Sequence, residues 1–150
     1  MSDYDPNYIP KKTYALVGQK AIILNSQKQI LVLQRSEKSG AGGKWALPGG
    51  ALEFKEEPYN AIRREIKEET QLEVKDIKPY YLRTYTTDEN DFVLIVGYES
   101  KTNSENVILN WEHDSFKWLT KEEALKLDLT EDGRFFIEHF GNNSSSNIVY

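Results

Sequence analysis

The sequence predicts an α/β fold in which a mixed sheet lies between helices. Segments rich in β-branched and aliphatic residues flank a central stretch of strong helix formers, and a second helical stretch follows near the end of the chain. Strands on both sides of a helix, with another helix late in the chain, are typical of such layers. With 150 residues, 39% of them hydrophobic, the chain suits one domain, 1–150, with residues 1–11 and 141–150 as flexible tails.

Composition excludes several classes of protein. No apolar run approaches the ~20 residues needed to cross a membrane, and the polar N-terminus does not resemble a signal peptide. The absence of cysteine excludes disulfides and thiolate metal sites, and we expect a cytoplasmic protein. A net charge of −5 argues against binding to nucleic-acid polymers or anionic membranes.

The first third of the chain predicts strands and a loop. Residues 13–24 predict one or two strands, and a turn leads into a strand at 29–34, which makes a hairpin. Residues 36–44 predict a mobile loop. This loop is similar to a phosphate-binding loop, but it lacks that motif's spacing and the hydroxyl residue after Lys44.

After the central helix the pattern returns to strands. Residues 72–85 predict an extended segment interrupted at Pro79, residues 92–98 a buried strand and residues 116–119 a short strand. Thr120 is suited to cap a short helix, and residues 132–140 predict the last helix.

The central helix is predicted with defined ends. Pro58 suits the first helical position, because its missing N–H is not needed there. Glu56 and Glu57 lie at the positive end of the helix dipole. Residues 61–70 contain no Gly or Pro, so the helix is expected to continue through them.

Three carboxylates share one side of this helix. At about 100° per residue, Glu65, Glu68 and Glu69 fall within a sector of about 100°. They border the apolar face, to which Ile62, Ile66 and Tyr59 are assigned, while Arg63 and Lys67 point into water.

Clustered carboxylates have two interpretations. Like charges one turn apart destabilise a helix by about 0.2–0.5 kcal/mol, so a cluster beside the apolar face indicates a bound cation. Ligands that are all oxygen suit Mg²⁺, Mn²⁺ or Ca²⁺ rather than Zn²⁺. The alternative is a solvated acidic face without a ligand.

The residues around this helix resemble the Nudix box, G-x5-E-x7-R-E-U-x-E-E-x-G-U with U aliphatic. Eight of its nine defined positions match over 23 residues, and Trp45–Gly49 resembles the strand that leads into the box. The matching residues are Gly50, Glu56, Arg64, Glu65, Ile66, Glu68, Glu69 and Leu72. The resemblance implies a Nudix-type α/β/α sandwich over about residues 13–140, in a compact MutT-like member.

The resemblance also implies roles for the box residues. Glu65, Glu68, Glu69 and the Gly49 carbonyl are expected to bind Mg²⁺, with Mn²⁺ as a possible substitute. Glu56 and Arg64 are expected to pair and to hold the loop against the helix.

One box position departs from the family pattern, because Gln71 replaces the glycine that lets such a helix end in the left-handed region. The departure leaves undecided how the helix ends, but it does not affect the assignment of the carboxylates.

The general base is less well defined by the sequence. The family places a carboxylate shortly before a late strand, and Glu112 fits best, followed by Asp114. Glu65 or Glu69 could act instead, and the segment around Glu112 also reads as an ordinary acidic loop. No nucleophile motif accompanies His113 or the other histidine, so both are expected to be structural.

Candidate substrate contacts lie outside the box. In the family an arginine at the position of Arg35 often reaches substrate, although a salt bridge at the rim explains it equally well. Lys44 is a candidate phosphate contact. Asp132 is a candidate for hydrogen bonding to a purine edge, with helix capping as the alternative.

The expected reaction is Mg²⁺-dependent hydrolysis of a pyrophosphate bond in a small nucleotide, most simply a nucleoside triphosphate, oxidised or not, to monophosphate and pyrophosphate. Thr87 and Glu89 stand where other members carry markers for ADP-ribose or dinucleoside polyphosphates. The alternatives are an ADP-ribose or NDP-sugar pyrophosphatase and a non-catalytic nucleotide sensor. We expect a monomer or a homodimer.

Overall fold

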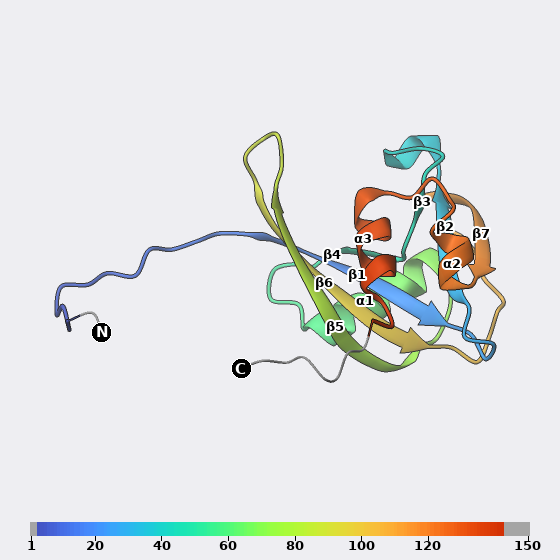
Figure 1. Ribbon diagram of the computed structural model, residues 1–150, viewed down its shortest axis with the longest axis horizontal. Helices are drawn as coiled ribbons and strands as arrows, with labels where there is room; N and C mark the ends of the chain where they lie inside the picture. The colour runs from blue at the N-terminus through green and yellow to red at the C-terminus, as the bar shows by residue number, and fades with distance from the viewer. Residues whose placement is uncertain (1–2, 143–150) are drawn as a thin grey trace.

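Seven strands form one mixed sheet in the computed structural model, which describes residues 3–142 (Figure 1). In chain order, the elements are β1 (Leu16–Leu24), β2 (Ile30–Arg35), the 3₁₀ turn η1 (Glu37–Ser39), β3 (Trp45–Ala46), β4 (Gly49–Ala51), α1 (Pro58–Thr70), β5 (Lys75–Thr86), β6 (Phe92–Lys101), β7 (His113–Leu119), α2 (Lys121–Ala124) and α3 (Glu131–His139).

The hairpin predicted from the first strands forms only at its turn. Strands β1 and β2 pair at Leu24 and Ile30 and then diverge, β1 running parallel to β6 and β2 antiparallel to β7. The segment 45–51 crosses between them, since β3 pairs with β2 and β4 pairs with β1. This crossing places Gly49 directly opposite Lys20.

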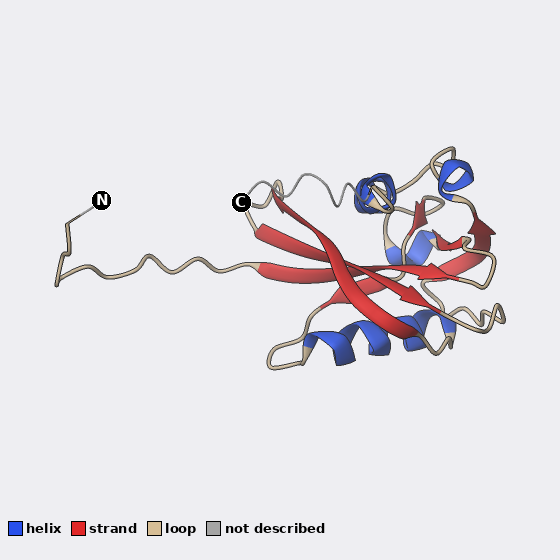
Figure 2. Ribbon diagram, turned by 60° about the horizontal axis from the view of Figure 1, so that its bottom comes forward, coloured by secondary structure: helices blue, strands red, loops and turns tan. Residues whose placement is uncertain are grey.

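Helices cover both faces of the sheet, as the α/β/α prediction requires (Figure 2). Alternate residues of a strand point to opposite faces. On one face, Ala21 and Ile23 pack in the same core as Ile62 and Ile66 of α1. On the other face, Ile22 packs with residues of α2 and α3.

Some element boundaries differ from the prediction. Strand β5 continues through Pro79, where a shift of register between Pro79 and Tyr81 accommodates a residue that cannot donate a ladder hydrogen bond. Strand β7 begins at His113, earlier than expected, because His113 pairs with Arg35 of β2. Helix α3 begins at Glu131.

The chain ends differ in how much is described. Residues 3–15 form no helix or strand and extend away from the sheet (Figure 1). The expected tail at 141–150 lies mostly outside the described residues. No helix within residues 3–142 is both long and apolar enough to span a membrane.

Candidate active site

Helix α1 begins where the sequence predicts, and its C-terminal cap, which the sequence left open, is defined in the structure. Pro58 is its first residue, and the Glu57 carboxylate caps it by accepting hydrogen bonds from the N–H groups of Tyr59 (3.1 Å) and Asn60 (2.9 Å). At the other end, Gln71 adopts a left-handed conformation with φ of 59°. The cap geometry is therefore present without the glycine that usually provides it.

The three carboxylates of α1 differ sharply in burial. Glu69 is only 3% exposed and accepts a hydrogen bond from the Gly49 N–H at 3.1 Å. Burial raises the pKa of Glu69 to about 8, although Lys20 and the Gly49 N–H oppose this. Burial also raises the pKa of Glu65, against the effect of Arg64, whereas the Glu68 side chain is 55% exposed. The three carboxylates therefore form a series from the exposed Glu68 through the half-buried Glu65 to the buried Glu69.

Tyr59 does not belong to the buried face of α1. It is 40% exposed and meets Tyr98 edge to face, with the ring centroids 5.9 Å apart. Its position in the first turn places it at the margin of the sheet, so the apolar face consists of Ile62 and Ile66 with Ala61.

Two glycines allow the backbone to approach the helix closely. A Cβ on Gly49, where φ is 151°, would lie 2.0 Å from the backbone oxygen of Gln19. A Cβ on Gly50 would lie 2.5 Å from the Glu65 carboxylate. Both positions therefore require glycine, and they bring the Gly49–Gly50 backbone against the carboxylates of α1.

Arg64 and Glu56 pair, as predicted. Arg64 donates to Glu56 from Nε at 2.7 Å and from the terminal nitrogen Nη2 at 3.1 Å, a bidentate arrangement. This pairing lowers the pKa of Glu56 and raises that of Arg64. The second terminal nitrogen of Arg64 also reaches Glu65 at 3.0 Å and Glu68 at 3.3 Å. Arg64 therefore joins the loop before α1 to two of the predicted metal ligands.

The carboxylates fit a divalent cation chemically, but they are not gathered into a coordination cluster. Within residues 3–142, no three acidic, cysteine or histidine side chains lie close enough together to hold a metal ion. Instead, Arg64 donates hydrogen bonds to the carboxylates of Glu65 and Glu68. An all-oxygen donor set with Glu69 at its buried end suits a hard cation such as Mg²⁺. The raised pKa of Glu69 shows that its negative charge is poorly compensated by the protein.

Glu112 lies near these carboxylates. It immediately precedes β7, and its charge contributes to the raised pKa values of Glu65 and Glu69. Asn110 donates to its carboxylate at 3.1 Å. The Ser39 hydroxyl donates to the Glu112 backbone oxygen at 2.8 Å, which fixes the predicted loop beside it.

The two histidines are not arranged for nucleophilic catalysis. His113 is 5% exposed, and burial lowers its pKa to about 4, so it is neutral at physiological pH. The neighbouring Asp114 charge opposes this lowering only in part. His139 stacks on Tyr81 at 4.3 Å.

A cavity of about 260 Å³ brings together two of the three predicted substrate contacts. Its lining comprises Lys20, Arg35, Ser39, Gly40, Ala41, Ala46, Thr130 and Asp132. Lys44 does not line it and pairs instead with Asp128 at 3.2 Å. Arg35 donates to the backbone oxygens of Ser39 and Gly40, and no ion pair of Arg35 is found among residues 3–142. The cavity thus contains two cationic side chains and one carboxylate.

Asp132 is not the helix cap that the alternative reading required. Thr130 is the N-cap of α3, and its hydroxyl accepts from the Gly133 N–H at 3.2 Å. The Asp132 side chain is therefore available to the cavity and to its partner Arg83, which donates to Oδ1 at 2.7 Å.

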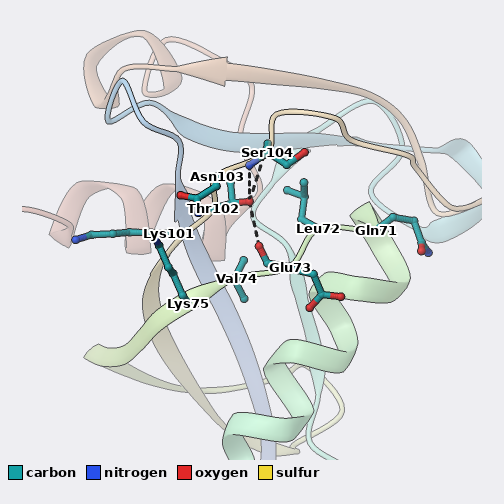
Figure 3. Close-up of a pocket in the computed structure, with 9 residues that line it drawn as sticks. All are labelled: Gln71, Leu72, Glu73, Val74, Lys75, Lys101, Thr102, Asn103 and Ser104. Carbon is teal, nitrogen blue, oxygen red and sulfur yellow. Dashed lines mark hydrogen bonds between the residues drawn. The ribbon is translucent and has the colours of Figure 1, made fainter.

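A larger cavity, of about 400 Å³, lies at the C-terminal end of α1 (Figure 3). It is lined by residues 71–75 and 101–104, and the Thr102 hydroxyl donates to the Glu73 backbone oxygen inside it. It contains none of the box carboxylates and none of the predicted substrate contacts. Size therefore does not identify the active site, and the chemistry favours the smaller cavity.

Sequence reasoning missed Lys20. This half-buried lysine lines the smaller cavity and also acts on the charge of Glu69, so it links the cavity to the carboxylates of α1. The available signal was a Gln-Lys pair inside an otherwise apolar strand, where a charged residue is uncommon.

Comparison with known proteins decides the family. The NUDIX domain model matches residues 16–140. The chain is a Nudix hydrolase. It is 32% identical over 123 residues to the nucleoside triphosphatase NudI of Enterobacter sp. (strain 638), covering 75% of this chain and 87% of the relative. NudI of Klebsiella pneumoniae (strain 342) is 26% identical over 130 residues, covering 80% of this chain and 92% of that one.

Solved structures place this Nudix hydrolase among MutT-like folds. The MutT protein of Methanosarcina mazei Go1 aligns with a TM-score of 0.68 and 26% identity, covering 86% of this chain and 94% of that chain. The NUDIX domain of Shewanella oneidensis NrtR, solved with ADP ribose, aligns with a TM-score of 0.71 and 23% identity, covering 89% and 91%. The second likeness concerns the fold alone. Members of the family generally use divalent metal cations.

Proposed function

We propose that this Nudix hydrolase cleaves a nucleoside triphosphate to the monophosphate and pyrophosphate with Mg²⁺, which Mn²⁺ can replace. The observation that carries the proposal is the position of Lys20, which lines the cavity containing Arg35 and Asp132 and acts on the buried carboxylate of Glu69. A nucleotide held in the cavity would thus have its phosphates beside the carboxylates of α1. The similarity to NudI, named a nucleoside triphosphatase, supports this substrate class.

Lys20 and Arg35 would hold the phosphates. The chain has a net charge of −5, so attraction of an anionic substrate depends on local cations. Both residues line the cavity, while Lys44 lies outside it with Asp128. We therefore assign phosphate binding to Lys20 and Arg35 and give Lys44 at most a peripheral role.

The metal would be held by Glu65, Glu68, Glu69 and the Gly49 carbonyl. When bound, a divalent cation neutralises phosphate oxygens and lowers the pKa of a coordinated water. Before binding, Arg64 neutralises Glu65 and Glu68 at 3.0 and 3.3 Å. Its bidentate pair with Glu56 would keep the guanidinium in place if Glu65 and Glu68 bound a cation instead.

Glu112 would accept the proton of the attacking water. Its carboxylate lies close enough to Glu65 and Glu69 to influence their pKa values, and Asn110 orients it with a hydrogen bond of 3.1 Å. A carboxylate in this position could act as a general base. His113, being neutral and buried, is given no role in proton transfer.

The proposal is tested by separating and quantifying the products formed from a panel of substrates, by anion-exchange chromatography, with and without Mg²⁺. The panel contains the eight common nucleoside and deoxynucleoside triphosphates, 8-oxo-dGTP, ADP-ribose, an NDP-sugar and Ap4A. We expect triphosphates to release pyrophosphate with the highest kcat/KM, and Glu68→Gln to reduce this by at least ~10²-fold. A faster reaction with ADP-ribose or an NDP-sugar would refute the substrate class, and nucleotide binding without turnover would indicate a sensor.

A further inference from the structure

Arg83 occupies a well-defined place beside the cavity, although nothing in the sequence pattern drew attention to it. It lies on β5, and its side chain is 14% exposed. The guanidinium carbon lies 4.8 Å from the ring centre of Tyr85 and 5.1 Å from that of Phe135. Contacts with two aromatic rings restrict the guanidinium to one position.

From this position Arg83 divides its hydrogen bonds between two acidic residues of α3. One terminal nitrogen donates to Asp132 Oδ1 at 2.7 Å, and the other donates to Glu131. The two carboxylates differ in surroundings, since the Glu131 side chain is 87% exposed and that of Asp132 is 21% exposed. Of the two, only Asp132 lines the cavity.

The Asp132 carboxylate keeps hydrogen-bonding capacity after this contact. An ionised carboxylate has about four acceptor positions and no donor. Arg83 uses one oxygen and the Tyr85 hydroxyl also hydrogen-bonds to this carboxylate, so about two acceptor positions remain, and the capping of α3 is carried out by Thr130 rather than by Asp132. A group that can only accept hydrogen bonds thus faces a cavity that also holds Lys20 and Arg35.

We propose that Arg83 is a positioning residue that fixes Asp132 as the acceptor for the exocyclic amino group of a nucleotide base. This inference rests on the proposed function, because it assumes that the cavity takes a nucleotide. An acceptor-only group favours a base with an amino group over the same base without one. Arg83 therefore sets the preference for amino-bearing bases without touching the substrate.

The alternative is that Arg83 only joins β5 to α3. Both roles predict some loss of stability when Arg83 is replaced, so melting temperature alone cannot separate them. They differ in base preference, which only a positioning role would change. Glu131 provides the matched control, because it shares Arg83 but does not line the cavity.

The experiment measures kcat and KM of the full chain for two matched pairs, dGTP against dITP and dCTP against dUTP. In the wild type we expect kcat/KM to favour the amino-bearing member by about tenfold, mostly through KM, as for one hydrogen bond to a charged group. Arg83→Met and Arg83→Lys should reduce this ratio toward one, with less effect on kcat. Asp132→Asn, which adds a donor, should reverse the dCTP to dUTP preference. Glu131→Gln should keep the wild-type ratios.

Several outcomes would overturn the inference. These are a wild-type ratio near one in both pairs, an unchanged ratio in a folded Arg83 variant, or an equal loss in Glu131→Gln. If the wild type turns over no triphosphate, the proposed function fails, and the same pairs are compared by calorimetric binding in Ca²⁺. Binding with the expected ratios would then support the inference alone, and no binding would refute both.

Discussion

Replacing Glu69 by Gln should stabilise the metal-free protein, by an amount that grows with pH. Burial raises the pKa of Glu69 from 4.5 to about 8. The folded state therefore holds a proton that the unfolded state releases between these values. Stability from this group is fully present below pH 4.5 and is lost as pH rises toward 8. Gln cannot ionise, so the variant does not have this loss.

The size of the effect follows from the two pKa values. Between about pH 5 and 7.5, the free energy of unfolding of the wild type should fall relative to the variant by about 1.4 kcal/mol per pH unit. At pH 7 the difference reaches about 3 kcal/mol. The Gln side-chain oxygen can still accept the Gly49 N–H, so this buried backbone donor keeps its partner.

The assay is urea unfolding in EDTA at several pH values from 5 to 8. His113 acts in the opposite direction, because its pKa is lowered from 6.5 to about 4 and its contribution to stability rises over that range. Both proteins contain His113, so subtracting one curve from the other removes its effect. Glu68→Gln, at a position 55% exposed, should follow the wild type. Parallel pH curves for the wild type and Glu69→Gln would refute the assigned cause.

The other predictions concern the C-terminal cap of α1, the Arg64–Glu56 pair and the candidate general base Glu112. Gln71→Gly should raise the melting temperature by about 1–2 °C, because a Cβ in the left-handed conformation costs about 1 kcal/mol, more than the extra entropy that Gly gives the unfolded chain. A lower melting temperature in calorimetry would contradict this. Arg64→Ala should lower both the melting temperature and kcat, the latter by at least ~10-fold, because Glu56 loses its partner, whereas the exposed Arg63→Ala should change neither. Glu112→Gln should lower kcat by about 10²-fold with little change in melting temperature, and normal turnover would place the base elsewhere.

Local sequence was sufficient for the parts of the site that are local in space. Pro58 begins α1 as predicted, and the expected Arg64–Glu56 pair joins α1 to the loop directly before it. The β-branched and aliphatic residues within 13–24 also predicted a strand, which β1 confirms. These features depend on neighbours within about two turns of chain.

Long-range features could not be read from the sequence. Lys20 acts on Glu69 because the segment 45–51 crosses between β1 and β2. Hydrophobic periodicity in the sequence does not predict such a crossing. The partnership of Arg83 with Asp132 joins residues 49 positions apart. Lys44 looked equally suited to bind phosphate, but it lies just before β3 and its side chain pairs with Asp128.

The divergence of β1 and β2 explains why one site can combine such different groups. Strands that pair along their length leave no room between them, whereas these two pair only at Leu24 and Ile30. The segment 45–51 bridges the opening, and its glycines bring backbone within contact of Glu65. Through the same opening, Lys20 on the α3 side of the sheet acts on Glu69, which belongs to the helix covering the other side. The proposed substrate cavity and the predicted metal ligands thus lie on opposite faces of the sheet, and Lys20 links them where the sheet is open.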